Sequence, residues 1–245
     1  MLLCCGGAER GAARDAERDA AARTRTLRGL TDRRAQHTSV QLHGRTLTLE
    51  QSPCAISTGL RVWAASEVLA ALTAYDQNSP LRHCGRVVEL GAGCGVAGLA
   101  LALGGAAVTF TDLADDLLEP LRRNVEANLA GSDAAAPLFA IHRWGTPPAN
   151  LDPPYDLVIG ADVAVDDHLV APLVASVVAL CGAHSVAILA TEERGTHRLL
   201  HAALRRAFRR VDFVRRSTVR RCLARAEVDT APADWVAVAV CRGVR

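Results

Sequence analysis

A glycine-rich run near the middle of the chain is the strongest chemical signal in the sequence. Residues 89–95 read ELGAGCG and directly follow a short apolar segment. Glycine permits a sharp turn and a close approach to a ligand because it carries no Cβ atom. The next apolar segment ends at Asp112, whose carboxylate suits the two hydroxyls of a ribose. The spacing therefore predicts a nucleoside-binding turn between a strand and a helix.

Two classes of nucleoside cofactor use this layout. Residues 93–98, GCGVAG, satisfy the glycine spacing of a dinucleotide site. Glu89, however, would place a carboxylate beside the pyrophosphate, which is unfavourable. A carboxylate suits the ammonium and sulfonium of S-adenosylmethionine instead. S-adenosylmethionine is therefore the favoured cofactor, with a dinucleotide, or a tight turn that binds nothing, as the alternatives.

Strand and helix patterns alternate around this run. Strands are predicted at residues 86–90, 107–111, 138–142, 155–161 and 185–190, and helices at 58–75, from the glycine run to 103, and at 115–129, 168–180 and 196–208. Two late strands, at 213–219 and 235–241, are expected to form an antiparallel hairpin at the sheet edge without an intervening helix. An earlier β-hairpin is predicted around Gly44. The alternation predicts an α/β fold with a mostly parallel sheet covered on both faces.

Composition separates an N-terminal tail from a single domain. Residues 1–36 are rich in charge and alanine and predict a flexible tail, and residues 37–245 predict one folded domain. Half of the 245 residues are apolar, but no apolar run reaches the length of about 18 residues that spans a bilayer. We expect a monomeric protein of the cytoplasm, and also of the nucleus, with no membrane partner.

Metal chemistry is not expected from the cysteines and histidines. The eight cysteines are scattered without a C-x-x-C pair, and the histidines lack metal-ligand spacing. The charges are uneven, because residues 194–225 hold eleven arginines and one acid, Asp212. Such a patch could bind RNA or an acidic protein face, and the plainer interpretation is a solvated surface.

Residues 38–243 resemble the lysine methyltransferase-like family of seven-strand methyltransferases. The resemblance rests on G-x-x-x-W-x-A at 59–65, the glycine motif at 87–95, the ribose turn at 111–113, N-V-x-x-N at 124–128, W-G at 144–145 and the strand with its acid at 155–162. It implies a Rossmann-like sheet of seven strands, S-adenosyl-L-methionine as the cofactor, and transfer of its methyl group to a lysine nitrogen. The implied partner is a protein, such as a chaperone, an ATPase or a translation factor, with nucleic acid as the less favoured partner.

The resemblance also implies roles for single residues. Asp162 would orient the incoming amine as the catalytic residue, and no metal would take part. Cofactor contacts are implied for Trp63, Glu89, Gly91, Ala92, Gly93, Asp112, Trp144 and Ala161. Among these, Glu89 and the glycine backbone would hold the methionine end, and Asp112 the ribose.

One position departs from the family pattern. The family usually carries D-x-x-Y after the fourth strand, whereas residues 162–165 read DVAV, with Val165 at the tyrosine position. That tyrosine normally helps to shape the amine pocket. A module that binds S-adenosylmethionine without catalysis is therefore one alternative, and methylation of RNA or a small molecule is another.

A second motif points towards nucleic acid. Residues 152–155 read DPPY, with which methyltransferases of adenine or cytosine hold an exocyclic amine. In those enzymes the motif follows the fourth strand, whereas here the apolar strand follows the motif. We therefore expect the motif at the opposite edge of the sheet, some 20 Å from the methyl donor.

Overall fold

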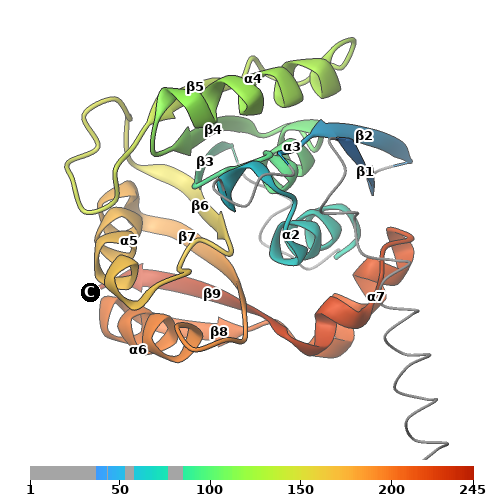
Figure 1. Cartoon of the computed structure of the whole chain (residues 1–245). Helices are drawn as coiled ribbons and strands as arrows, with labels where there is room; N and C mark the ends of the chain where they lie inside the picture. The colour runs from blue at the N-terminus through green and yellow to red at the C-terminus, as the bar shows by residue number, and fades with distance from the viewer. Residues whose placement is uncertain (1–36, 43, 53–57, 77–84) are drawn as a thin grey trace, which may run out of the picture. The chain divides into compact units, whose positions relative to one another are not determined.

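The computed structural model describes residues 37–42, 44–52, 58–76 and 85–245, all of which belong to the unit Thr31–Arg245 (Figure 1). The predicted tail, residues 1–36, lies outside the described residues. So do His43 in the predicted hairpin and the cysteines Cys4, Cys5, Cys54 and Cys84. The domain boundary at residue 37 stays a prediction.

A seven-stranded sheet forms the centre of this unit, in the order β5-β4-β3-β6-β7-β9-β8. Its parallel strands are β3 (Arg86–Leu90), β4 (Ala107–Asp112), β5 (Leu138–Ile141), β6 (Tyr155–Ala161) and β7 (Cys181–Glu192). Strand β9 (Val236–Val244) runs antiparallel to β7 and to the edge strand β8 (Phe208–Phe213). The predicted mostly parallel sheet is confirmed.

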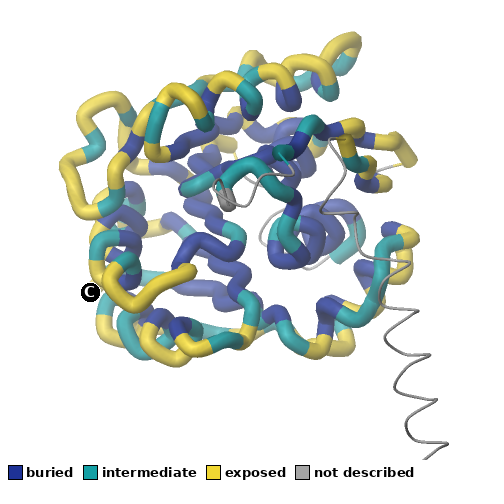
Figure 2. The backbone as a smooth tube through the Cα atoms, viewed as in Figure 1, coloured by how far each residue is buried: buried dark blue, intermediate teal, exposed yellow. Residues whose placement is uncertain are grey.

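Helices cover both faces of the sheet. Their bounds are α2 (Ala64–Tyr75), α3 (Val96–Leu103), α4 (Asp115–Leu129), α5 (Asp167–Leu180), α6 (His197–Ala207) and α7 (Arg216–Arg225), with the short helices η1 (Thr58–Leu60) and η3 (Ala231–Asp234). One apolar core joins the sheet to α2, α3, α4 and α7, and a second joins it to α5 and α6. Figure 2 shows the central strands buried between these layers. Such strands read as almost continuous apolar runs because both of their faces are covered.

The predicted N-terminal hairpin is confirmed as β1 (His37–Leu42) paired antiparallel with β2 (Arg45–Glu50). Two asparagines of α4 bond the backbone of β2. Asn124 accepts from the Glu50 N–H at 2.7 Å, and Asn128 accepts from the Thr48 N–H at 3.0 Å. Each amide also donates back to the carbonyl of the same residue, at 2.9 and 2.8 Å. The two asparagines of the N-V-x-x-N motif thus form hydrogen bonds with backbone N–H and C=O groups of β2 that would lack protein partners at an unpaired strand edge.

The prediction for the last strands was partly wrong. The antiparallel pair at the sheet edge is confirmed, but β8 lies at Phe208–Phe213 and helix α7 separates it from β9. Residues 213–219 were expected to be a strand. Val219, Cys222 and Leu223 explain the difference, because their spacing of three and four residues forms one buried helical stripe. The arginines between them stay at the surface.

The D-P-P-Y motif lies at the amino end of β6, as expected. Arg86 fixes it there, donating to the Asp152 carbonyl at 2.6 Å and to its carboxylate at 2.9 Å. Ala161 marks the opposite, carboxyl end of the same strand. Within the described residues, every helix is too short or too polar to cross a membrane.

Candidate functional site

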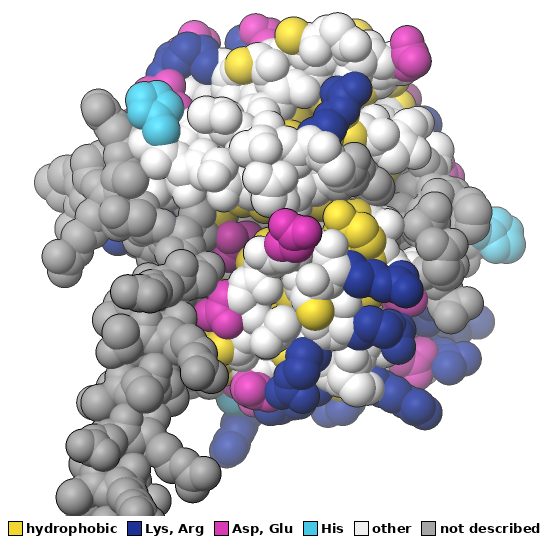
Figure 3. Space-filling view, turned by 90° about the vertical axis from the view of Figure 1, so that its right-hand side faces the viewer, with side chains coloured by type: hydrophobic (Ala, Val, Ile, Leu, Met, Phe, Trp, Pro, Cys, Tyr) yellow, Lys and Arg dark blue, Asp and Glu magenta, His cyan; other side chains and the backbone are white. Residues whose placement is uncertain are grey.

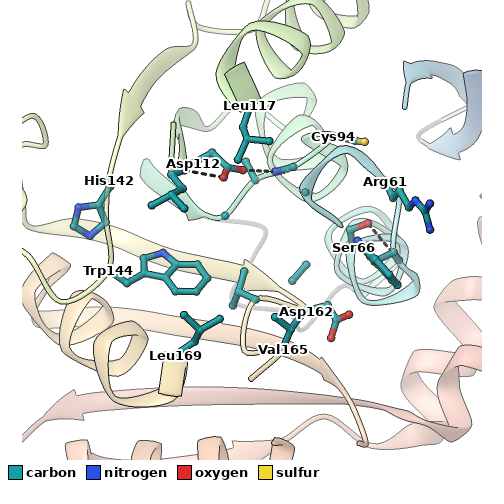
Figure 4. A pocket seen from close by; sticks show the side chains of 18 of the residues that line it. Arg61, Ser66, Cys94, Asp112, Leu117, His142, Trp144, Asp162, Val165 and Leu169 are labelled. Carbon is teal, nitrogen blue, oxygen red and sulfur yellow. Dashed lines mark hydrogen bonds between the residues drawn. The ribbon is translucent and has the colours of Figure 1, made fainter. Parts of the chain in front are cut away.

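A cavity of about 630 Å³ opens at the carboxyl ends of the parallel strands (Figure 4). This is the edge where open α/β sheets bind their ligands, and the volume suits a small-molecule cofactor. The cavity brings together most residues predicted from the sequence. Those that line it are Trp63, Gly91, Ala92, Gly93, Asp112, Trp144, Ala161 and Asp162.

The glycine loop needs its glycines for conformation and for space. Gly91 and Gly93 have φ angles of 62° and 56°, in the left-handed region that other residues rarely adopt. A Cβ atom on Gly93 would lie 2.5 Å from the Gly59 carbonyl oxygen, and one on Gly91 would lie 3.1 Å from the Trp144 ring. The backbone of the loop therefore faces the cavity without side chains in between.

Backbone donors hold the Asp112 carboxylate at the edge of the cavity. One oxygen accepts from the Gly93 N–H at 3.0 Å and the other from the Leu113 N–H at 2.7 Å. Burial raises the pKa of this carboxyl, and the two hydrogen bonds act in the opposite direction. Since each carboxylate oxygen accepts more than one hydrogen bond, lone pairs remain for hydroxyl groups from the cavity.

Glu89 differs from the other predicted cofactor residues, because it does not line the cavity. Its carboxylate is buried behind the glycine loop and accepts from the Gly98 N–H of α3 at 3.0 Å. Burial raises its pKa from 4.5 to about 8. The structure thus gives Glu89 a role in fixing the start of α3, and direct contact with the methionine end of a cofactor stays a prediction.

Aromatic and apolar side chains form the cavity walls. Trp144 extends into the cavity between the Asp112 side and the Leu169 side, as Figure 4 shows. His142 lies beside it, with its Nε2 2.9 Å from the Ser176 hydroxyl, and burial lowers its pKa. That hydroxyl also accepts from the Gly145 N–H at 3.0 Å, which ties the W-G turn to α5.

Asp162 lies on the opposite side of the cavity and adopts a left-handed φ of 55°. Only 1% of its side chain is exposed. The Arg194 guanidinium donates to one carboxylate oxygen, and the Glu192 N–H lies 3.5 Å from the other. The same guanidinium lies 5.9 Å from the centre of the Trp63 ring, a distance typical of cation–π contact. The predicted catalytic acid is therefore already paired with a cation.

Several lining residues were not predicted. They include Leu113, Leu117, His142, Val163, Leu169 and Arg194. Leu113 and His142 directly follow β4 and β5, so the rule that strand ends face the ligand would have found them. Arg194 lies between β7 and α6, where no sequence pattern marks it.

Comparison with known proteins now places this geometry in a family. The family model described as lysine methyltransferase matches residues 41–206. The chain belongs to the lysine methyltransferase family. This family uses S-adenosylmethionine, and the cavity fits that cofactor in size, in its ribose-side carboxylate and in its exposed loop backbone. The residues that would hold it are those of the loop, Asp112 and the two tryptophans.

Curated relatives support the family assignment. EEF1A lysine methyltransferase 3 of Mus musculus is 31% identical over 175 residues, which cover 71% of this chain and 73% of that protein. Protein N-lysine methyltransferase METTL21A of Mus musculus is 37% identical over 134 residues, covering 54% and 60% of the two chains. This chain thus aligns with less than two thirds of METTL21A.

Solved structures show the same fold at low identity. The 16S rRNA N2 G1207 methyltransferase (RsmC) of T. thermophilus, in complex with AdoMet and guanosine, matches with a TM-score of 0.55 and 20% identity. The match covers 84% of this chain and 50% of that one. Magnesium protoporphyrin IX methyltransferase (ChlM) from Synechocystis PCC 6803, with bound SAM, gives a TM-score of 0.50 at 17% identity, covering 73% and 78%. Together with the family, they confirm the predicted Rossmann-like methyltransferase fold.

Proposed function

We propose that this methyltransferase modifies the side-chain nitrogen of a lysine in a protein substrate. The observation that carries the proposal is the pair of buried carboxylates, Asp112 and Asp162, on opposite sides of one cavity. The first suits a ribose and the second an ammonium group. The lysine methyltransferase family and the relatives named as protein N-lysine methyltransferases support this choice of acceptor.

The cofactor side of the cavity would bind S-adenosylmethionine through groups that are already fixed. Asp112 would accept from the ribose hydroxyls, and the backbone of residues 91–93 would hold the methionine end, with Glu89 behind the loop fixing the start of α3. Trp63, Trp144 and Ala161 would enclose the adenosine. When bound, the cofactor supplies a methyl group that is already activated by the sulfonium. The protein therefore contributes alignment of the two reactants and exclusion of water.

The acceptor side must bind the lysine and favour its neutral form. A lysine ammonium has a pKa near 10.4, so it must lose a proton before its nitrogen can attack. Asp162 would attract and orient the ammonium, and the apolar residues Val163 and Val165 would desolvate it, which lowers its pKa. Asp162 is the proposed catalytic residue because it would touch the reacting amine.

Transfer of radiolabelled methyl groups from S-adenosylmethionine into a cell lysate tests this proposal. We expect label that protease removes and nuclease does not, and methyl-lysine after acid hydrolysis of the labelled protein. A translation factor is the first purified acceptor to test, because one relative is named for EEF1A. Label that only nuclease removes, or no label at all, would contradict the proposal.

The remaining expectations about the protein's surroundings are proposals as well. We propose that it acts as a monomer in the cytoplasm and also in the nucleus. Light scattering at micromolar concentration tests the monomeric state. Fractionation of cells that express the full chain tests the location. A dimer would contradict the first, and recovery from a membrane fraction would contradict the second.

A further inference from the structure

The cation already paired with Asp162 has a consequence for the acceptor. The Arg194 guanidinium donates to the Asp162 carboxylate and lines the same cavity. The Arg194 side chain is 39% exposed, whereas the Asp162 side chain is 1% exposed. An ammonium group that approaches Asp162 from the cavity therefore meets the guanidinium first, and Arg194 stands where the acceptor amine must bind.

Displacement of Arg194 from Asp162 would remove the carboxylate that accepts its hydrogen bond, while the negative charge of Glu192 stays nearby. Although burial opposes its charge, the hydrogen bond and negative charge of Asp162, together with the charge of Glu192, raise the pKa of Arg194. The guanidinium therefore stays positive and repels a lysine ammonium at the same carboxylate. A carboxylate on the acceptor would remove this conflict, because a guanidinium binds carboxylates with two parallel hydrogen bonds.

The rest of the cavity lining offers no spare acid for Arg194. Among the described lining residues, Asp112 and Asp162 are the acidic ones, and Asp112 lies on the opposite side of the cavity. Besides Arg194, the other charged or titratable lining residues are Arg61, Cys94, His142, Arg143 and His168. The described lining therefore holds three arginines and two acids.

Arginine side chains also outnumber acidic ones on the surface around α7. Arg216 of α7 pairs at 2.8 Å with Glu193, which follows Glu192 and precedes Arg194 in the chain. Figure 3 shows arginine side chains gathered around α7, with fewer acidic side chains between them. Around α7, within the part of the chain that the structure describes, the exposed residues Arg215, Arg221 and Arg225 form no ion pair with a carboxylate.

We propose that Arg194 selects acceptor segments in which an aspartate or glutamate flanks the target lysine. When the segment binds, the lysine ammonium takes the place of Arg194 at Asp162, and the guanidinium binds the flanking carboxylate. Arg194 is then a specificity-determining residue, and the acceptor is an acidic protein segment. The target lysine in this inference rests on the proposed function. The flanking carboxylate is inferred from the pairing of Asp162 with Arg194.

Three peptides test the proposal: acetyl-GEEKEEG-amide, its neutral counterpart acetyl-GQQKQQG-amide, which is nearly equal to it in size, and the basic peptide acetyl-GRRKRRG-amide. Their binding is measured by calorimetry with S-adenosylhomocysteine present, and their methylation by kcat/KM with radiolabelled S-adenosylmethionine. We expect the wild-type protein to favour the acidic peptide by about tenfold, the effect of one charge-assisted hydrogen bond. In Arg194→Gln the preference should fall below about twofold, and in Arg194→Glu it should turn into a preference for acetyl-GRRKRRG-amide.

Arg198→Gln is the matched control, because Arg198 is exposed on α6 and does not line the cavity. It should keep the full preference of the wild-type protein. A preference that survives in Arg194→Gln, no discrimination by the wild-type protein, or no binding of any of the peptides at millimolar concentration would each overturn the inference. Binding of a single-stranded oligonucleotide that exceeds peptide binding and depends on Arg194 would also overturn it.

The two readouts separate this inference from the proposed function. Discrimination in binding that depends on Arg194, without methylation of any peptide or lysate protein, would support the role of Arg194 and contradict lysine methylation. Equal methylation of the acidic and neutral peptides would support lysine methylation and contradict the role of Arg194.

Discussion

Two buried carboxylates on opposite sides of one cavity are held in different ways. The oxygens of Asp112 accept from the backbone N–H groups of Gly93 and Leu113. One oxygen of Asp162 accepts from the side chain of Arg194, and the other lies at the longer distance of 3.5 Å from the Glu192 N–H. Backbone donors in a tight loop cannot move away, but a partly exposed guanidinium can. On the proposed function, the cofactor side of the cavity is therefore fixed before the cofactor binds, and the acceptor side would exchange one cation for another.

This contrast agrees with what each side must do. A cofactor site gains affinity from donors and acceptors that need no rearrangement when the ligand binds. An acceptor site must receive a charged side chain and then release it after transfer. A substitution on one side of the cavity should therefore leave the function of the other side intact.

The largest expected effect is on transfer in Asp162→Ala. Removal of the carboxylate takes away the group that would orient the amine, so we expect kcat for methyl transfer to fall by about 100-fold or more. Radiolabel transfer to the acceptor found in lysate measures this. Asp166→Ala is a matched control, because Asp166 is an exposed aspartate that precedes α5 outside the cavity lining. Transfer at the wild-type rate in Asp162→Ala would contradict the assigned role.

A smaller effect is expected on the cofactor side in Gly93→Ala. The substitution places a Cβ 2.5 Å from the Gly59 carbonyl oxygen at a φ of 56°, so the loop or the segment at Gly59 must shift, which disturbs the Gly93 N–H bond to Asp112. We expect affinity for S-adenosylmethionine to fall about tenfold, as strain of this kind predicts. Calorimetry of the purified variant gives the result. Gly131→Ala is the control, because its φ is also positive but its Cβ would meet open space. Equal affinities in the two variants would mean that the loop position does not matter.

Val165→Tyr tests whether a tyrosine at this position improves the use of the acceptor. Val165 lines the cavity and is 40% exposed, so a larger ring fits without displacing a packed core residue. We expect kcat/KM for the protein acceptor to rise about threefold through added contact with the amine-bearing chain. Affinity for S-adenosylmethionine should stay the same. A gain from no activity at all to measurable activity would instead indicate that the natural protein binds the cofactor without catalysis.

The last expected effect is on the stability of the fold, through the pH dependence that Glu89 contributes. Burial raises its pKa in the folded protein to about 8, above the value of 4.5 for an exposed group. Between these values the folded protein binds more protons than the unfolded chain, so the free energy of unfolding decreases as pH rises from 4.5 to 8. Glu89→Gln should remove this contribution. Urea unfolding at pH 5, 6, 7 and 8 measures the difference between the two proteins, and equal pH slopes would contradict the assigned burial.

Much of the fold was predictable because its signals are local. The glycine run and the apolar strands on either side of it predicted β3, β4 and the turn that carries Asp112, and helix α4 was predicted with its observed bounds, Asp115–Leu129. Helix α7 was missed because its three buried residues are separated by arginines, and so short a stripe resembles a strand or a loop. Its packing against α2, which decides the matter, is a tertiary effect.

The two sides of the cavity also differed in how well they could be predicted. Asp112, the glycines and both tryptophans follow recognisable motifs, and the structure brings them together in one cavity. The pairing of Asp162 with Arg194 joins residues 32 positions apart, across β7 and its following turn. No motif marks that arginine, because its role depends on where the turn after β7 places it. Sequence patterns thus predict the side with Asp112 and the glycine loop better than the side with Asp162 and Arg194.

The most direct test of the account is calorimetric titration of S-adenosylmethionine into two variants, Asp112→Ala and Asp162→Ala, beside the wild-type protein. Loss of hydrogen bonds from a charged acceptor should weaken binding about 100-fold in Asp112→Ala. Asp162→Ala should bind the cofactor within about threefold of the wild-type protein, because its carboxylate faces the acceptor. Equal losses in the two variants, or a larger loss in Asp162→Ala, would contradict the division of the cavity into a fixed cofactor side and an exchangeable acceptor side.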